Sequence, residues 1–393
     1  MKHFVIGPVR LVTASGIREN TEVEVRDGRI AAVRDFDPNG ALPRVDGRGL
    51  FLSAGFIDLH LHGGGGADFM DGTPEAFMTA ARAHMRHGTT SMVPTTLTGT
   101  LEELCGVFDV LREVEASPEA EDLPELLGIH MEGPYVAPSQ CGAQDPAYIR
   151  NPEDGSYKLL AEHAAGAIRI WTVAPELPGA ERICEDLKDE GIVFSLGHTA
   201  ATYEQAKAAV EAGYTMATHL YSSMSTITRK NGSRILGVIE TSLLLDEVCC
   251  EVIADGMHLP PELLKLIYKT KGKDRICLIT DAMRGAGMPA GIYKLGSLAN
   301  GQDVIVGPDI ARMPDGISFA GSVATTDRLV RVMTKQVGIP LPEVIGMITE
   351  NPAKAIGEDA RKGKVEPGFD ADLVLFDENI GIEAVFVRGK KTV

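Results

Sequence analysis

The chain has 393 residues, of which 44% are hydrophobic and 24% charged, the balance of an ordinary globular protein. Its formal net charge of -17 argues against nucleic acid or an anionic membrane as a partner, because both are bound through clustered Lys and Arg. No apolar run reaches the ~18 residues of a membrane helix, and residues 1–10 lack the apolar core of a signal peptide. The six cysteines form no C-x-x-C pair, so we expect reduced thiols in a cytoplasmic protein.

Both ends of the chain show short β patterns. Strand-like stretches are residues 21–25, 29–33, 371–376 and 383–388. Asp27-Gly28, between the first two stretches, is typical of a hairpin turn. Because chain termini often lie close together, we expect residues 1–52 and 359–393 to form one small β-sandwich domain.

Between these segments, short apolar runs alternate with amphipathic stretches, which indicates βα units and a parallel sheet. The predicted strands are residues 55–60, 90–94, 126–130, 168–173, 192–196, 216–219, 248–253 and 275–280. The predicted helices include 74–87, 202–211, one opened by Pro260-Pro261, and 325–336, the last preceded by an inserted hairpin region at 291–319. Eight such units favour a (β/α)8 TIM barrel over residues 53–358, with a doubly wound open sheet as the alternative.

Ionisable side chains fall where these strands end, which is where the active site of a TIM barrel lies. They are His60, His62, Glu132, His198, His219, His258 and Asp281. His60 and His62 are two residues apart on a strand, so they point to the same face. Imidazole and carboxylate suit Zn, Fe(II) or a related divalent ion. The first five residues exceed the ligands of one tetrahedral ion, so the sequence leaves one or two ions open, with Glu132 as a candidate bridge.

Each of these residues also has an ordinary structural explanation. Glu132 and Asp281 could each cap a following segment, and a lone buried histidine usually bonds to backbone, as we expect for His130. Their joint occurrence at successive strand ends favours a metal site. A metal held with an open position activates water, so the pattern predicts a metal-dependent hydrolase.

Eight stretches carry a resemblance to a known family. They are Gly55–Gly63, His130–Tyr135, Ser195–Thr199, Ala217–Tyr221, Ile253–His258, Ile279–Met283, Ala320–Ser322 and Asn351–Gly357. On these residues nearly the whole chain resembles the amidohydrolase superfamily, and within it the N-acetylglucosamine-6-phosphate deacetylases. The H-x-E-G-P and A-D-G-x-H stretches are fairly specific to these deacetylases, whereas H-x-H on the first strand is shared across the superfamily.

The resemblance implies a distorted TIM barrel with a β-sandwich made from both termini. It implies that Glu132, His198 and His219 hold the main ion. Some members of the family carry H-x-H and bind a second ion, so His60 and His62 imply the two-metal type. A homodimer is implied as well.

The resemblance also implies an activity, the hydrolysis of a linear amide. N-acetylglucosamine 6-phosphate, an N-acetylated sugar phosphate, would give acetate and glucosamine 6-phosphate. His258 would hold or polarise the acetyl carbonyl, and Asp281 would act as general base and then general acid.

Two substrate-facing stretches depart from the family pattern. Ser222 and Ser223 stand where the family usually has Asn-Ala, and Gln144 stands where it commonly has His. Backbone amides and hydroxyls at 222 and 223 could still seat the sugar phosphate. We assign Gly321 and Ser322 to the same substrate surface.

A basic patch stands out in this acidic chain. Arg229, Lys230 and Arg234 could bind the phosphate, in a neighbouring subunit as in the family's dimers. The alternative is an ordinary solvated loop.

Two other functions remain open at this point. The first is a related hydrolase acting on N-acetylgalactosamine 6-phosphate, an N-acyl amino acid or a cyclic amide. Cyclic-amide hydrolases often carry a carboxylated Lys where this chain has Glu132, which argues against that group. The second is a non-catalytic scaffold, which the loss of Asp281 or of several ligands would signal, and all of them are present.

Overall fold

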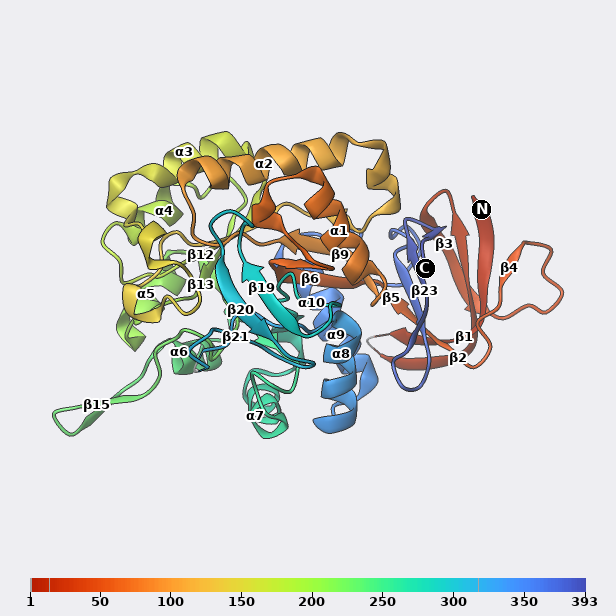
Figure 1. The fold of residues 1–393 in the computed structure, drawn as a ribbon. Coiled ribbons are helices and arrows are strands. Elements are labelled where there is room, and N and C mark those ends of the chain that lie inside the picture. Colours follow the sequence, from red (N-terminus) through yellow and green to blue (C-terminus); the bar gives the residue numbers. More distant parts are fainter. Residues whose placement is uncertain (1, 14, 317) are drawn as a thin grey trace.

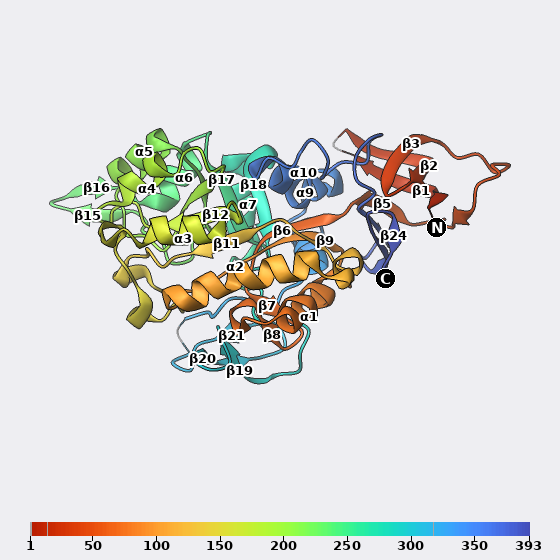
Figure 2. The ribbon, with the colours of Figure 1, turned by 90° about the horizontal axis from the view of Figure 1, so that it is seen from above.

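The computed structural model describes residues 2–13, 15–316 and 318–393. A large α/β body carries a smaller all-β part at one side, and both chain termini lie in that smaller part (Figures 1 and 2). Within the described ranges, every helix is too short or too polar to cross a membrane.

Parallel strands form the centre of the body. One sheet has the order β11 (Ile129–Glu132), β12 (Ile168–Val173), β13 (Val193–Leu196), β14 (Tyr214–Ala217), β17 (Cys249–Ile253) and β18 (Ile276–Ile279). The other has the order β10 (Glu125–Leu126), β9 (Thr89–Pro94) and β6 (Phe56–Leu61). Parallel bridges Leu61–Ala282 and Thr95–His130 link the two sheets at both edges. Each predicted strand has its counterpart here, with bounds that differ by at most three residues and that coincide for β12.

An apolar cluster lies on one face of these strands. Side chains from alternate positions of different strands form one buried cluster, which includes Ile57, Leu59, Val93, Ile170, Met216, Ile253 and Ile279. A larger cluster lies between the strands and the helices around them. The strands are therefore covered on both faces, as expected of a parallel sheet.

Ten α-helices are present in the described ranges. Their bounds are α1 Pro74–Met85, α2 Leu101–Ala116, α3 Ser156–Ala164, α4 Ala180–Asp186, α5 Tyr203–Ala212, α6 Val238–Leu244, α7 Pro261–Lys271, α8 Thr326–Arg331, α9 Leu341–Ile348 and α10 Glu350–Ala355. Thr73 caps α1, and Pro74 occupies the first turn, where its missing N–H removes no hydrogen bond. The helix predicted at 325–336 is α8 followed by a π-helix, Val332–Gln336.

The all-β part joins the two ends of the chain. Its strands are β1 (His3–Thr13), β2 (Gly16–Arg26), β3 (Arg29–Asp35), β4 (Arg44–Val45), β5 (Phe51–Ala54), β22 (Leu373–Phe376), β23 (Ile382–Val387) and β24 (Lys390–Lys391). They pair in the order β24-β23-β22-β5-β1-β2-β3, with β4 on β1. We predicted a sandwich, but the hydrogen bonds define one continuous sheet, because β5 pairs with β1 on one side and β22 on the other.

Three small antiparallel units leave the body. The predicted insertion is a sheet of β19 (Gly291–Leu295), β20 (Gln302–Val306) and β21 (Ala311–Arg312). β7 (Gly63–Gly64) pairs with β8 (Ala67–Asp68). β15 (Thr228–Lys230) and β16 (Ser233–Ile235) form an arm that projects away from the body (Figure 1).

Candidate active site

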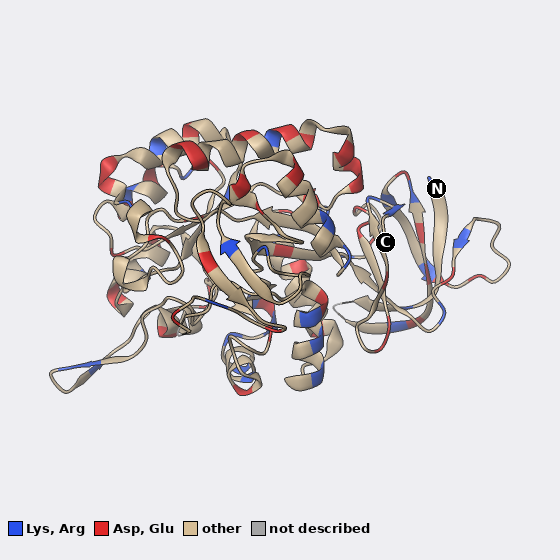
Figure 3. Cartoon of the chain, viewed as in Figure 1, with Lys and Arg blue, Asp and Glu red and all other residues tan. Residues whose placement is uncertain are grey.

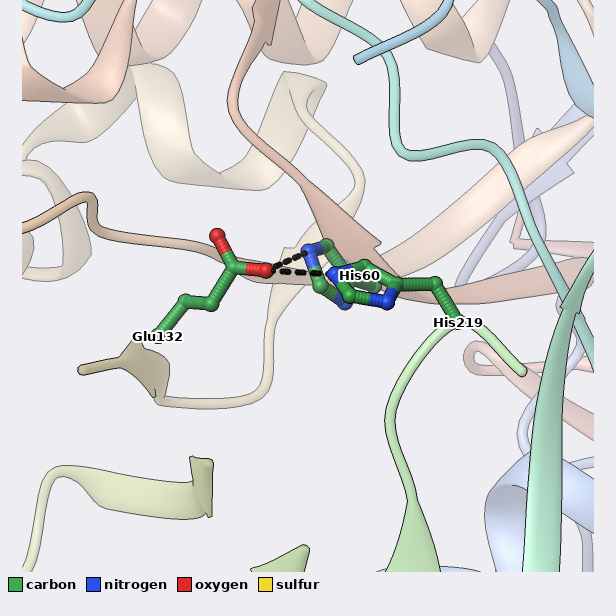
Figure 4. Close-up of side chains that lie close together, drawn as sticks. All are labelled: His60, Glu132 and His219. Atoms are coloured by element: carbon green, nitrogen blue, oxygen red, sulfur yellow. Dashed lines mark hydrogen bonds and ion pairs between the residues drawn. The ribbon is translucent and has the colours of Figure 1, made fainter. Parts of the chain in front are cut away.

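Glu132 is the centre of a buried cluster of histidines. It ends β11, and its Oε1 lies 2.8 Å from His219 Nε2 and 2.9 Å from His198 Nε2. His60 Nε2, from β6, lies 3.5 Å from the same oxygen (Figure 4). One carboxylate oxygen thus faces three imidazole nitrogens that come from three different strands.

The other carboxylate oxygen faces a second group. His62 Nε2 lies 3.5 Å from Glu132 Oε2 and 3.1 Å from Asp281 Oδ1. His60 Nε2 lies 3.6 Å from Asp281 Oδ1, so His60 belongs to both groups. Ligand atoms of His60, Glu132 and His219, and likewise of His60, His62 and Asp281, lie within 4.8 Å of one another.

The backbone turns sharply where these residues leave their strands. His198, His219 and Asp281 have φ values of 47°, 26° and 50°, and Ser223 has 49°. A residue with a Cβ rarely adopts this left-handed region, and such residues gather at functional sites. The strain at three strand ends therefore coincides with the side chains that meet around Glu132.

Hydrogen bonds fix the ends of β6 and β18 relative to each other. Asp58, on β6, accepts from the Thr280 hydroxyl at 2.6 Å and the Thr280 amide at 3.2 Å. The Asp281 amide donates to the His60 carbonyl at 2.8 Å. Burial raises the pKa of Asp58 to about 7. These bonds place Asp281 beside His60 and His62.

Glu251 was missed by the sequence analysis. It lies on β17 with no exposed surface, and its Oε2 is 3.0 Å from His60 Nδ1 and accepts from the His219 amide at 3.3 Å. The available signal was a single acid within the apolar run Cys249–Ile253. His130, by contrast, is bonded to backbone as predicted, through Nδ1 to the Leu59 carbonyl at 3.1 Å.

The charges of the cluster act strongly on one another. Burial disfavours the ionised Glu132, but the charges of His198 and His60 outweigh it and hold the pKa of Glu132 well below its usual range. Burial holds the pKa of His60 well below its usual value. Burial also opposes the charge of His62, but the hydrogen bond to Asp281 and the charge of Glu132 raise its pKa to about 9. An anionic centre surrounded by imidazoles is a place where positive charge is stabilised.

The residues fit a divalent ion. Among the described side chains, His60 Nε2 and His219 Nδ1 are buried without a hydrogen-bond partner. The donor set is imidazole nitrogen and carboxylate oxygen, which Zn(II) and Fe(II) accept. All five predicted ligand residues lie in this one cluster.

A cavity of about 310 Å3 opens onto the cluster. Its lining includes His62, Glu132, Gln144, His198, His219, Tyr221, Ser222, Ser223, His258, Leu259, Asp281, Leu295, Phe319 and Gly321. The predicted substrate residues Gln144, Ser222, Ser223, His258 and Gly321 are therefore together. Leu295 and Phe319, at the edges of the inserted sheet, were not predicted.

Ser322 lies apart from the cavity lining. Its side chain is fully buried, and its hydroxyl donates to the Thr280 carbonyl at 2.6 Å and accepts from the Ala324 amide at 2.9 Å. Its hydroxyl holds the turn after β18, and the assignment of Ser322 to the substrate surface stays a prediction.

Gln144 contacts the cluster itself. Its Nε2 donates to Glu132 Oε2 at 2.5 Å, and its Oε1 accepts from the Thr98 amide at 2.6 Å. Both ends of the amide are thus engaged by the protein, on the wall of the cavity.

His258 is held by a second carboxylate. Its Nδ1 lies 2.9 Å from Asp255 Oδ2, and its ring lies 4.4 Å from the ring of Phe319. When Nδ1–H bonds to Asp255, Nε2 is the ring nitrogen left for a ligand in the cavity.

The basic residues of the arm lie elsewhere. Arg229 and Arg234 are exposed and face each other across the β15–β16 pair, and neither lines the cavity of its own chain (Figure 3).

This fold and cluster match a known family. The chain belongs to the amidohydrolase family, whose model matches residues 51–392. Within it, the chain is similar to N-acetylglucosamine-6-phosphate deacetylases. The enzyme of Lysinibacillus sphaericus is 34% identical over 98% of this chain and 97% of its own length, and that of Bacillus subtilis is 35% identical over 98% and 96%.

A solved structure agrees with this placement. A mutant N-acetylglucosamine-6-phosphate deacetylase of Mycobacterium smegmatis, in complex with N-acetylglucosamine 6-phosphate, is 31% identical and superposes with a TM-score of 0.91, covering 100% of both chains. A β-aspartyl dipeptidase of Fervidobacterium islandicum, 18% identical with a TM-score of 0.62, shares the fold alone.

Proposed function

We propose that this chain hydrolyses the acetamide of N-acetylglucosamine 6-phosphate to acetate and glucosamine 6-phosphate. The observation that carries the proposal is the Glu132-centred cluster opening onto the cavity, in a chain that matches deacetylases over nearly its whole length. We further infer that the strands close into a (β/α)8 barrel. The bridges Leu61–Ala282 and Thr95–His130 support this closure.

The cluster would hold one or two divalent ions, zinc or iron. Glu132, His198 and His219 would hold the first, and His60, His62 and Glu132 the second. A bound ion would supply Lewis acidity and lower the pKa of a water molecule.

Asp281 and His258 would handle the proton and the acetyl oxygen. Asp281 Oδ1 stands 3.1 Å from His62 Nε2 and lines the cavity, so it can take the proton of the attacking water. It then returns that proton to the departing amine. Protonated on both ring nitrogens, His258 would keep Nδ1–H on Asp255 and donate Nε2–H to the acetyl oxygen as negative charge develops on that oxygen.

The substrate surface would be made by two subunits. Ser222, Ser223 and Gly321 line the cavity and would contact the sugar phosphate. Arg229 and Arg234 lie on the projecting arm, from which they would reach the phosphate in the partner of a homodimer. The exposure of both side chains supports this proposal. A cytoplasmic location stays a prediction.

The test is acetate release from N-acetylglucosamine 6-phosphate, its galactose epimer and both unphosphorylated sugars. We expect the highest kcat/KM with a phosphorylated sugar, because phosphate contacts supply binding energy. Equal rates with and without phosphate would contradict a sugar-phosphate substrate. No acetate from any of the four would contradict the proposed function.

N-acetylgalactosamine 6-phosphate is the second candidate. An N-acetylgalactosamine-6-phosphate deacetylase of Escherichia coli is 32% identical over 97% of this chain and 97% of its own length. Ser222, Ser223 and Gln144 are the cavity residues at which the chain departs from the glucosamine pattern. A preference of kcat/KM for the galactose epimer in the same assay would select this substrate.

A further inference from the structure

Glu251 lies beneath the histidine cluster and is the one acidic residue there with no role so far. Its side chain is fully buried on β17. Burial removes the hydration of a carboxylate at a cost in free energy, so a buried carboxylate is expected to have a hydrogen-bonding or charged partner or a function. Among the described residues, no Lys or Arg forms an ion pair with it, and its ionic contacts are with His60 and His130 alone.

The two oxygens of Glu251 have different surroundings. Oε2 lies 3.0 Å from His60 Nδ1 and accepts from the His219 amide at 3.3 Å. Oε1 is buried without a hydrogen-bond partner, with His130 Nδ1 3.8 Å away. The side chain is therefore directed at His60, and it touches His219 only through the backbone.

Glu251 is not itself a ligand in this arrangement. Side-chain atoms of His60, His130 and Glu251 lie within 4.8 Å of one another, close enough to suggest an ion between them. However, His130 uses Nδ1 for the Leu59 carbonyl at 3.1 Å and Nε2 for the Thr172 hydroxyl at 2.7 Å. With both nitrogens engaged, His130 has no lone pair left for an ion.

The contact with His60 fixes which ring nitrogen faces the ions. When Nδ1–H donates to Glu251, the tautomer of His60 carries its lone pair on Nε2. Nε2 is the atom that lies 3.5 Å from Glu132 Oε1 and 3.6 Å from Asp281 Oδ1, and it is buried without a hydrogen-bond partner. A carboxylate behind a ligating imidazole fixes its orientation and increases its basicity.

From this geometry we infer that Glu251 is a positioning residue that orients His60 and thereby determines whether the second ion is bound. The inference rests on the proposed function, in which His60 and His62 hold that ion. Because Glu251 contacts the side chain of His60 and only the backbone of His219, its loss affects the second ion more than the ion held by Glu132, His198 and His219.

The test compares Glu251→Gln and Glu251→Leu. Both replacements are neutral and close in size to Glu, so the buried strand accepts them. Gln keeps an acceptor for His60 Nδ1 but removes the charge, and Leu removes both. Cys250→Ala is the matched control, because Cys250 is the neighbouring buried residue and points instead to the Ser242 carbonyl, 3.7 Å away.

The readout is the binding of Co(II) to chelator-treated full-length protein, followed by its absorption spectrum and by metal analysis. We expect the wild type and Cys250→Ala to bind two equivalents. In Glu251→Leu the second equivalent should bind about 100-fold more weakly and in Glu251→Gln about 10-fold, with the first equivalent and its spectrum unchanged.

Three results separate the outcomes. Unchanged affinity for the second equivalent in Glu251→Leu overturns the inference. Equal weakening of both equivalents, with a lower Tm of the metal-free variant, shows a structural role only and also overturns it. If the wild type binds only one equivalent, there is no second ion and the inference is wrong, but the proposed hydrolase activity is not contradicted. If the wild type binds no Co(II), the proposed function itself is contradicted.

Discussion

Among the described residues, two groups built around carboxylates are packed closely enough to suggest a cation, and they are built differently. The first surrounds Glu132 at the carboxyl ends of the strands. The second consists of Glu125, Asp370 and Asp372, which lie between the body and the terminal sheet. In the first cluster the neighbours of the carboxylate are imidazoles. In the second they are Lys362 and the arginines Arg29, Arg361 and Arg388.

The second cluster contains its own cations. Lys362 Nζ lies 2.6 Å from Asp372, 2.8 Å from Glu125 and 3.5 Å from Asp370, and its side chain is 1% exposed. Arg361 lies 2.6 Å from Glu125 and 2.8 Å from Asp370. A group of carboxylates is therefore a candidate ion site only where no Lys or Arg of the described chain pairs with it and its neighbours are imidazoles, as around Glu132.

Removal of metal should separate the two clusters most sharply. A chelator is expected to abolish acetate release, and added zinc or iron to restore it, because among the described residues no Lys or Arg pairs with Glu132 or Asp281. Metal analysis should give one to two ions per chain, and the same number in Asp370→Asn. A lower ion count in Asp370→Asn would place an ion in the second cluster and contradict the difference between the two clusters. A metal-free protein with full activity would contradict a metal site in the first cluster.

Asp281→Asn tests whether the first cluster serves chemistry. The amide cannot accept the proton of water, so we expect kcat to fall by about 10²–10⁴-fold with the ions retained. Turnover and bound metal are measured on the same preparation, and Tm should stay that of the wild type. If the variant kept more than roughly a tenth of the wild-type kcat, the proposed role of Asp281 in proton transfer would be wrong.

Lys362→Met tests whether the second cluster serves stability. Removal of the buried ammonium leaves Asp372 without an ion-pair partner among the described residues, while Glu125 and Asp370 keep only their arginines. This loss should lower the free energy of unfolding by about 3–5 kcal/mol. Urea denaturation measures this loss, and kcat should be unchanged. Lys207→Ala, which breaks an exposed pair with Glu211 at 3.1 Å, is the control, with a loss of about 0–1 kcal/mol. Equal losses in the two variants would contradict the structural role.

The pH dependence of stability should have opposite signs in the two clusters. Burial opposes the charge of Glu125, but Arg361 and Lys362 outweigh it and lower its pKa from 4.5 to about 2. The contribution of Glu125 to the free energy of unfolding is present above pH 4.5 and is lost as pH falls through about 2. The pKa of His62 in metal-free protein is raised from 6.5 to about 9. The contribution of His62 to the free energy of unfolding is present below pH 6.5 and is lost as pH rises through about 9.

Thermal unfolding at a series of pH values, with and without chelator, measures both contributions. We expect the decline in Tm between pH 6.5 and 9 only in chelator-treated protein, because an ion replaces the proton on His62. The acid-side decline should occur in both samples and should shrink in Lys362→Met. An alkaline decline that is the same with metal present would contradict the link between His62 and the ion.

The strands, and the side chains that meet around Glu132, could be predicted from the sequence because both follow from local patterns. Alternation and apolar runs marked the strands, and polar residues at strand ends marked His60, His62 and His198. Glu251 and Asp58 could not be placed in this way, since a period-two pattern shows the face of a residue but not its partner across the interior. The partner of Glu251, His60, is 191 residues away.

Pairing between distant segments was also outside the reach of local patterns. The two ends of the chain were predicted to meet, but the order of the strands depends on β5 pairing with both β1 and β22. The hydrogen bond from the Ser322 hydroxyl to the Thr280 carbonyl was likewise not predicted. The direction of one side chain in a tight turn depends on hydrogen bonds that no residue type alone specifies.

The terminal sheet has a consequence for how the protein is made. β5 (Phe51–Ala54) is hydrogen-bonded along one edge to β22 (Leu373–Phe376), which the ribosome adds more than three hundred residues later. During synthesis the amino-terminal strands must therefore wait with an unpaired edge, which is a known template for association between chains. By contrast, Glu132, His198 and His219 have all been made by residue 219. In the growing chain these three residues of the Glu132 cluster are complete long before the sheet that joins its two ends.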